Sequence, residues 1–203
     1  MKRIPAKLLL LALLLGVSGV AGWAQAAAAA PAAAPPQGTA GTKDEAWRNF
    51  EDACSKVVRL AETIPAEKYT WRPGEGVRSF SELFLHIAAG NFSITRRLGA
   101  TLPEGVDLRT IEKSTTEKAK VIETLKQSLE HAKKAYLAVD DAEKTAPWLG
   151  GRQASMREIM FFLASHNHEH LGQAIAYTRM NGITPPWTEE AQQRQQAQPS
   201  KRP

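Results

Sequence analysis

The sequence predicts an all-α fold, a four-helix bundle with long crossover connections. Four segments repeat apolar residues at three- and four-residue steps, the period of one face of a helix. Three of these segments begin with the pattern Ser-x-x-Glu, which can form a capping box at a helix N-terminus. No segment alternates with a period of two, so we expect no β-sheet.

The first helix is predicted over residues 44–64, where apolar side chains recur on one stripe and Pro65 ends the pattern. Cys54, the only cysteine of the chain, falls within that stripe. We interpret it as a small buried hydrophobe rather than a reactive thiol, because no nearby cation would favour the thiolate. A single cysteine also excludes an internal disulfide, so packing alone must stabilise the fold.

The capping patterns mark the starts of the other three helices. The serine–glutamate pairs are Ser79–Glu82, Ser114–Glu117 and Ser155–Glu158. The helices are predicted over residues 80–98, 115–139 and 156–181. The last helix ends where Gly182 can adopt a left-handed conformation, and Pro185 and Pro186 block its continuation.

The predicted connections are long for a simple bundle. They cover residues 65–78, 99–114 and 140–154. Neighbouring antiparallel helices usually need only about 2 to 8 connecting residues. We therefore expect at least one crossover rather than a plain up-down-up-down order.

The N-terminus has the three parts of a secretory signal peptide. Basic residues precede an apolar run over residues 8–21, and the small residues of Ala24–Ala26 suit cleavage. A run of about 14 residues is shorter than the roughly 20 that span a bilayer as a helix. We expect residues 1–26 to be a signal peptide cleaved near Ala26, which makes the mature chain periplasmic or secreted. An uncleaved membrane anchor is the alternative.

The rest of the chain divides into a linker, one domain and a tail. Residues 27–42 are rich in alanine and proline and are predicted to be a flexible linker. Residues 43–187 are long enough for one domain with its own core. Residues 188–203 are polar and rich in glutamine, and we expect a disordered tail.

The charge of the chain does not indicate a partner. The full sequence has 26 Lys and Arg against 21 Asp and Glu, but three of the basic residues lie in the predicted signal peptide. The mature chain would carry a net charge of about +2 and has no concentrated basic segment. Binding to nucleic acid is therefore not expected, and contact with a membrane is expected only through the export signal.

Three of the five histidines lie close together within the last predicted helix. At 3.6 residues per turn, His166 and His170 fall in the middle of the apolar stripe, whereas His168 lies about 180° away and faces solvent. Two imidazoles one turn apart can both offer a nitrogen to one ion. The alternative is a pair of core histidines satisfied by hydrogen bonds.

A third metal ligand should come from a facing helix. His86 lies at the edge of the apolar stripe of the second predicted helix, and Gly90, one turn further, leaves room for a close approach or for a substrate. His131 falls opposite the stripe of its helix, and we expect it at the surface. His86, His166 and His170 are therefore the candidate metal ligands, a set of three that is typical of catalytic zinc sites with an open fourth position.

Two longer motifs resemble the DinB-like superfamily of bacterial four-helix-bundle metalloproteins. They are "KYTWRPGEGVRSFSELFLHIAAGNF" at residues 68–92 and "HNHEHLGQAIAYTRMNGITPP" at residues 166–186. The resemblance implies that His86, His166 and His170 occupy the three metal-ligand positions of the family. It further implies a divalent metal, often zinc or nickel, and often a homodimer. Some relatives are thiol-dependent transferases, and others have hydrolase-like activity.

Two functions follow from these residues. The first is an exported metal-dependent hydrolase or transferase that acts on a small-molecule substrate, with no secure general acid or base, since Glu169 and Tyr177 have ordinary packing or solvent roles. The second is a non-catalytic bundle that binds a metal or is stabilised by it. A partner-binding role for the loop with Trp71 and Arg72 is a weaker alternative, because a loop aromatic more often packs over the end of a bundle.

Overall fold

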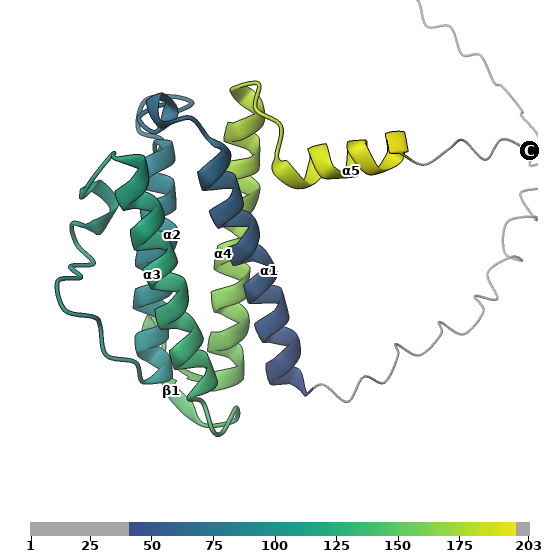
Figure 1. Ribbon diagram of the computed structural model, residues 1–203. Helices are drawn as coiled ribbons and strands as arrows, with labels where there is room; N and C mark the ends of the chain where they lie inside the picture. The colour runs from purple at the N-terminus through teal and green to yellow at the C-terminus, as the bar shows by residue number, and fades with distance from the viewer. Residues whose placement is uncertain (1–40, 198–203) are drawn as a thin grey trace, which may run out of the picture. The chain divides into compact units, whose positions relative to one another are not determined.

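Four long helices form the bundle in the computed structural model, which describes residues 41–197 (Figure 1). The helices are α1 (Thr42–Thr63), α2 (Phe80–Thr95), α3 (Lys118–Leu137) and α4 (Met156–Met180). Helix α1 packs mainly against α4, and α2 packs against α3 and α4. The predicted all-α bundle is confirmed. None of the helices within residues 41–197 is long and apolar enough to cross a bilayer.

The connection between α2 and α3 is a crossover. Helices α1 and α2 are antiparallel, but the chain then returns along the bundle, so α3 runs in the same direction as α2 (Figure 1). Two short 3-10 helices, η2 (Arg96–Leu98) and η3 (Ile111–Lys113), lie in this connection. The second of them packs against α2. The expected crossover is thus present, and it brings Glu112 next to a helix that is distant in sequence.

The three predicted capping boxes have different outcomes. At α2 the box is complete, because the Glu82 amide donates to Ser79 Oγ (3.3 Å) and the Ser79 amide donates to Glu82 Oε2 (2.8 Å). At α4 only half forms: the Glu158 amide donates to Ser155 Oγ (3.2 Å), but the Glu158 carboxylate pairs with Arg152. Competition from a guanidinium explains the missing half.

The predicted start of α3 at Ser114 is wrong by about one turn. Ser114 Oγ donates to the carbonyl of Ile111 (2.8 Å) and so closes the 3-10 helix η3 instead of capping α3. The helix begins at Lys118, after Glu117, whose amide donates to Thr115 Oγ1 (3.1 Å). Ser114 therefore caps no helix, because the Glu117 amide that its oxygen was expected to bind goes to Thr115 instead.

Two segments that we expected to be irregular have regular structure. Strands β1 (Thr145–Pro147) and β2 (Gln153–Ser155) pair antiparallel around the 3-10 helix η4 (Leu149–Gly151). The expectation of no sheet is therefore wrong for this small hairpin. Strands of three residues are too short to display a period of two.

The predicted tail is also partly wrong. Helix α5 covers Pro186–Ala197, so the described part of the tail is helical, and residues 198–203 lie outside the described residues. Pro186 suits the first position of a helix, and glutamine has good helix propensity. Trp187 packs against the core, and Glu190 pairs with Arg59 of α1.

The predicted signal peptide and residues 27–40 of the predicted linker also lie outside the described residues, whereas Thr42 already belongs to α1.

The core consists of two hydrophobic clusters on either side of a polar layer. The loop before α2 contains the 3-10 helix η1 (Ala66–Lys68). The cluster near this loop includes Tyr69, Phe80, Phe84, Leu171 and Tyr177. The cluster near the hairpin includes Phe50, Tyr136, Trp148, Met160 and Leu163. On α4 the residues between these clusters are 165–170, the histidine-rich segment. The bundle therefore buries its polar chemistry between two apolar ends.

The capping difference gives a test of the fold. Ser79→Ala removes an acceptor for a helix amide in a buried position, so we expect the free energy of unfolding to fall by about 1 kcal/mol. Ser114→Ala removes no helix cap, and we expect a smaller loss. Urea unfolding of the two variants measures the difference. An equal loss in both would contradict the assignment of Ser79 as the only complete cap of the predicted pairs.

Candidate metal centre

The structure brings His86, His166 and His170 together in the polar layer. One ring nitrogen from each lies within 4.8 Å of the others. The ring centroids of His86 and His170 are 4.5 Å apart, and those of His166 and His170 are 4.6 Å apart. The first ring comes from α2 and the other two from successive turns of α4. Within residues 41–197 these three side chains form the only cluster of possible metal ligands of this kind.

Two of the rings are held by hydrogen bonds through Nδ1. His86 Nδ1 lies 2.6 Å from Glu112 Oε1, and His170 Nδ1 lies 3.1 Å from Gln173 Oε1. The Gln173 amide nitrogen in turn donates to the hydroxyl of Tyr177 (2.8 Å), which fixes the orientation of the amide. A carboxylate and an amide oxygen can only accept, so Nδ1 must donate in both rings. In the neutral imidazoles the Nε2 lone pair is then free to bind a metal.

The third ring, that of His166, lies against Gly90 of α2. A Cβ atom at position 90 would be 2.8 Å from both ring nitrogens, which is closer than real contacts allow. The Nδ1 atom of His166 is buried and has no hydrogen-bond partner among residues 41–197. A buried nitrogen without a partner is costly, and a bound ion at the cluster would give this ring a favourable interaction. The room predicted at Gly90 is thus filled by the His166 ring.

The environment keeps the rings of His166 and His170 neutral. Burial in the first place, and then the charges of the neighbouring His170, His86 and Arg78, lower the pKa of His166 to about 4. Burial also lowers the pKa of His170, although its hydrogen bond to Gln173 opposes the shift. Neutral imidazole is the form that binds a metal, because its lone pair is not blocked by a proton.

Glu112 stays ionised beside His86. Burial acts to raise the pKa of Glu112, but hydrogen bonds from Arg78 and His86 outweigh burial and hold it below its usual range. Arg78 Nε donates to Glu112 Oε2 (2.9 Å) while His86 occupies the other oxygen. Three imidazoles, two of them oriented by acceptors, fit a divalent transition metal with nitrogen ligands.

A buried polar network beside the histidines joins all four helices. Cys54 Sγ of α1 donates to Asn167 Oδ1 of α4 (3.6 Å), and Asn167 Nδ2 donates to Asn91 Oδ1 of α2 (2.8 Å). Asn91 Nδ2 then donates to Ser128 Oγ of α3 (3.1 Å). All four side chains are buried. Asn91 and Asn167 follow Gly90 and His166 in sequence, so the network fixes the register of α2 and α4 where the rings meet.

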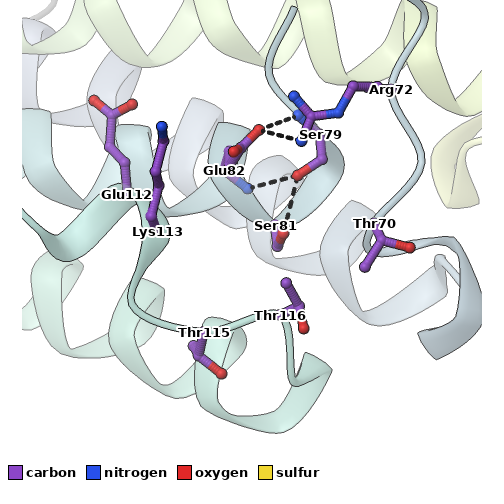
Figure 2. Close-up of a pocket in the computed structure, with 9 residues that line it drawn as sticks. All are labelled: Thr70, Arg72, Ser79, Ser81, Glu82, Glu112, Lys113, Thr115 and Thr116. Atoms are coloured by element: carbon purple, nitrogen blue, oxygen red, sulfur yellow. Dashed lines mark hydrogen bonds and ion pairs between the residues drawn. The ribbon is translucent and has the colours of Figure 1, made fainter.

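A polar pocket adjoins the cluster through Glu112 (Figure 2). Its volume is about 160 Å³, and most of its lining side chains are hydroxyls or charged groups. Arg72 pairs with Glu82 within it (3.1 Å), as the dashed lines in Figure 2 show. Arg72 and Lys113 balance Glu82 and Glu112 in the lining, so the pocket has no strong net charge for a ligand. Trp71, which precedes Arg72, packs against Phe80 and Tyr177 over the end of the bundle, as a structural loop aromatic does.

Comparisons with known proteins identify the family. A family model described as the DinB family matches residues 39–201. The chain belongs to the DinB family. Among solved structures, a DinB-like protein from Bacillus cereus matches with 14% sequence identity and a TM-score of 0.61. The match covers 70% of this chain and 93% of the Bacillus cereus chain. A DinB-like protein from Bacillus subtilis matches with 22% sequence identity and a TM-score of 0.45, over 69% of this chain and 93% of the Bacillus subtilis chain. No curated protein matches the chain.

Other predictions for this DinB-family chain have mixed outcomes. His168 is exposed as expected, and its Nε2 lies 3.1 Å from the carbonyl of Asn49 on α1. Cys54 is buried, and burial followed by the charge of Glu51 raises its pKa, which agrees with an unreactive thiol. The surface placement of His131 is wrong: the ring is half-buried against Phe92 of α2, with centroids 5.3 Å apart. The neighbouring helix covers part of the α3 face that the wheel of α3 alone leaves open to solvent.

Several residues around the DinB-family cluster were not predicted. Glu112 lies in a connection without periodicity, so no pattern in the sequence relates it to His86. Gln173 could have been found, because it follows His170 by three residues on the same helix face. Arg78 and the Asn91–Asn167 pair depend on how separate helices pack, which a single sequence does not specify.

The contact at Gly90 predicts a specific loss of metal affinity. Gly90→Ala would displace the His166 ring, so we expect metal affinity to fall by about 10- to 100-fold while the helices remain folded. Gly172→Ala is the matched control, because nothing lies within 4 Å of a Cβ there. That variant should keep its metal affinity and gain up to about 1 kcal/mol of stability. Competition with a chromophoric chelator measures the metal affinity, and thermal unfolding followed by circular dichroism measures the stability. Equal metal affinity in the two variants would contradict the contact between Gly90 and the His166 ring.

The low pKa of His166 predicts how the metal-free protein responds to acid. The unfolded chain has the ordinary value of 6.5 and the folded chain about 4, so the unfolded state binds the proton more tightly between these values. Stability is therefore lost as the pH falls, by about 2 kcal/mol from this residue between pH 7.5 and pH 5. Urea unfolding should show the full loss in the wild type and in His168→Gln. In His166→Gln the loss should be smaller by about 2 kcal/mol, with a remainder from His170, whose pKa is also lowered. The same pH dependence in all three would contradict the assignment.

Proposed function

We propose that this DinB-family protein is an exported metal-dependent enzyme, a hydrolase or a transferase that acts on a small molecule at the three-histidine cluster. The observation that supports it best is the arrangement of three imidazoles, two of which have Nδ1 occupied by an acceptor. Rings held in this way present their remaining lone pairs to one point before any ion binds. Such preorganisation is typical of metal centres.

The donor set favours an open centre. Among residues 41–197 the cluster offers three ligands, His86, His166 and His170, so a tetrahedral ion would have one position left for water or substrate. A bound zinc or nickel ion supplies Lewis acidity, which brings the pKa of a coordinated water or thiol close to neutral. The partly exposed His86, with a side chain 22% accessible, provides the side from which a small molecule can approach.

Export is the second part of the proposal. The basic and apolar N-terminal segments with "AQA" at Ala24–Ala26 support a cleaved signal peptide and a periplasmic or secreted mature chain. Outside the cytoplasm a low-molecular-weight thiol is less available, so we favour hydrolysis over thiol-dependent transfer. The mass of the mature protein recovered from its producing cell would identify the cleaved N-terminus, and retention of residues 1–26 would contradict export with cleavage.

Histidine variants test the metal centre directly. We expect the mature wild type, purified without a chelator or a metal-affinity tag, to contain about one equivalent of a transition metal. His170→Ala removes a buried ligand and should contain almost none, whereas His168→Ala removes an exposed ring and should keep the ion. Elemental analysis of the three proteins measures this difference. Equal metal contents in the two variants would contradict the assignment of ligands.

A substrate screen then separates catalysis from stabilisation. Chromogenic carboxylic esters, phosphate esters and amides should include a class that the metal-loaded protein hydrolyses and the metal-free protein does not. Circular dichroism controls for loss of fold on removal of the metal. If removal lowers the melting temperature but no class is hydrolysed, the non-catalytic metal-stabilised bundle becomes the better description.

A further inference from the structure

Arg78 lies next to the three-histidine cluster and is connected to it by one carboxylate. Its Nε donates to Glu112 Oε2 (2.9 Å), and the other oxygen of Glu112 is 2.6 Å from His86 Nδ1. The guanidinium charge also contributes to the lowered pKa of both His166 and His170. Arg78 is therefore joined to the cluster at His86 through the Glu112 carboxylate.

The hydrogen-bonding capacity of Arg78 is mostly unused. A guanidinium has five N–H groups, and only Nε–H of Arg78 donates a hydrogen bond to another residue within 41–197. The side chain is 39% accessible, so its terminal amino groups can be reached from solvent. Arg152 differs, because both of its terminal amino groups donate to the carboxylate of Glu158. Arg78 thus presents the planar donor pair that binds carboxylate or phosphate groups.

The charges of the site favour an anion at this point. Three neutral imidazoles leave the two positive charges of a divalent ion uncompensated. Glu112 is a single carboxylate whose oxygens are already shared between Arg78 and His86. The metal side of the guanidinium would therefore have a positive potential, which attracts and orients an anionic group.

We infer that Arg78 is the anion-binding residue of the metal centre and that the substrate carries a carboxylate or phosphate group held between Arg78 and the ion. This inference rests on the proposed function. It narrows the substrate class from small molecules in general to anionic ones. Phosphate monoesters and carboxylate-bearing esters or amides become the substrates to examine first.

A purely structural role for Arg78 makes a different prediction. If Arg78 only holds Glu112 in place for His86, then Glu112→Gln should weaken anion binding as much as loss of Arg78 does. If Arg78 binds the anion itself, Glu112→Gln removes a competing carboxylate and should preserve or increase anion affinity. The amide oxygen that this substitution introduces could still accept from His86 Nδ1, so the ring keeps a partner.

The test uses the mature chain loaded with cobalt(II), whose visible absorption changes when a ligand enters its coordination sphere. Metal content is measured first for each protein. Methyl phosphate and acetate are then titrated at constant ionic strength into the wild type and four variants. These are Arg78→Gln, Arg78→Lys, Glu112→Gln and Arg109→Gln. Arg109 is the matched control, because it lies on the surface with a side chain 90% accessible.

We expect the wild type and Arg109→Gln to bind at least one anion with the same Kd, and the anion bound more tightly identifies the class. Arg78→Gln should still hold cobalt but bind that anion about tenfold more weakly or worse, with Arg78→Lys between the two. Three results would each overturn the inference. They are unchanged anion affinity in Arg78→Gln, equal losses of anion affinity in Arg78→Gln and Glu112→Gln, and no anion binding by the cobalt-loaded wild type. A wild type without cobalt would instead overturn the proposed function.

Discussion

The close contact between Gly90 and the His166 ring determines how α2 and α4 meet in the middle of the bundle. A Cβ at position 90 would overlap the ring, so only glycine allows the two helices to approach this closely. That approach brings His86, one turn earlier on α2, into reach of two histidines on α4. The hydrogen bond between Asn91 and Asn167 fixes the register of the same two helices, because a shift of one residue would leave the buried Asn91 Oδ1 without its donor.

The cluster combines chemistry that is unfavourable in a core with surroundings that make it tolerable. Buried imidazoles are kept neutral by desolvation, which avoids a buried charge but leaves polar nitrogens to be satisfied. Glu112 and Gln173 satisfy two of them, and the apolar clusters on either side provide the stability of the bundle. Within residues 41–197, Nδ1 of His166 is the one fully buried nitrogen of the cluster without a hydrogen-bond partner. Burial, orientation and lone-pair availability therefore all suit a metal ion.

Helical periodicity was enough to predict the bundle and the inward pair on α4, because the direction of a helical side chain follows from its position in the repeat. It also placed His86 and Gly90 on the face that meets α4. The length of the connections was enough to predict the crossover. Glu112 could not be predicted, since its approach to His86 depends on the path of a connection with no periodic pattern. His131 was misplaced because the wheel of a single helix does not show how far a neighbouring helix covers it. The hairpin and α5 were missed because short strands and polar helices have weak sequence signals.

Anomalous diffraction at the zinc absorption edge, from crystals of the mature chain grown with zinc, is the most direct test of the central claim. We predict one strong peak about 2.0–2.1 Å from a single nitrogen of each of His86, His166 and His170. Glu112 and Gln173 should remain on the Nδ1 atoms of their rings. No peak between the three rings, or a peak coordinated by other side chains, would contradict a metal centre at this position and leave the histidines as buried core residues.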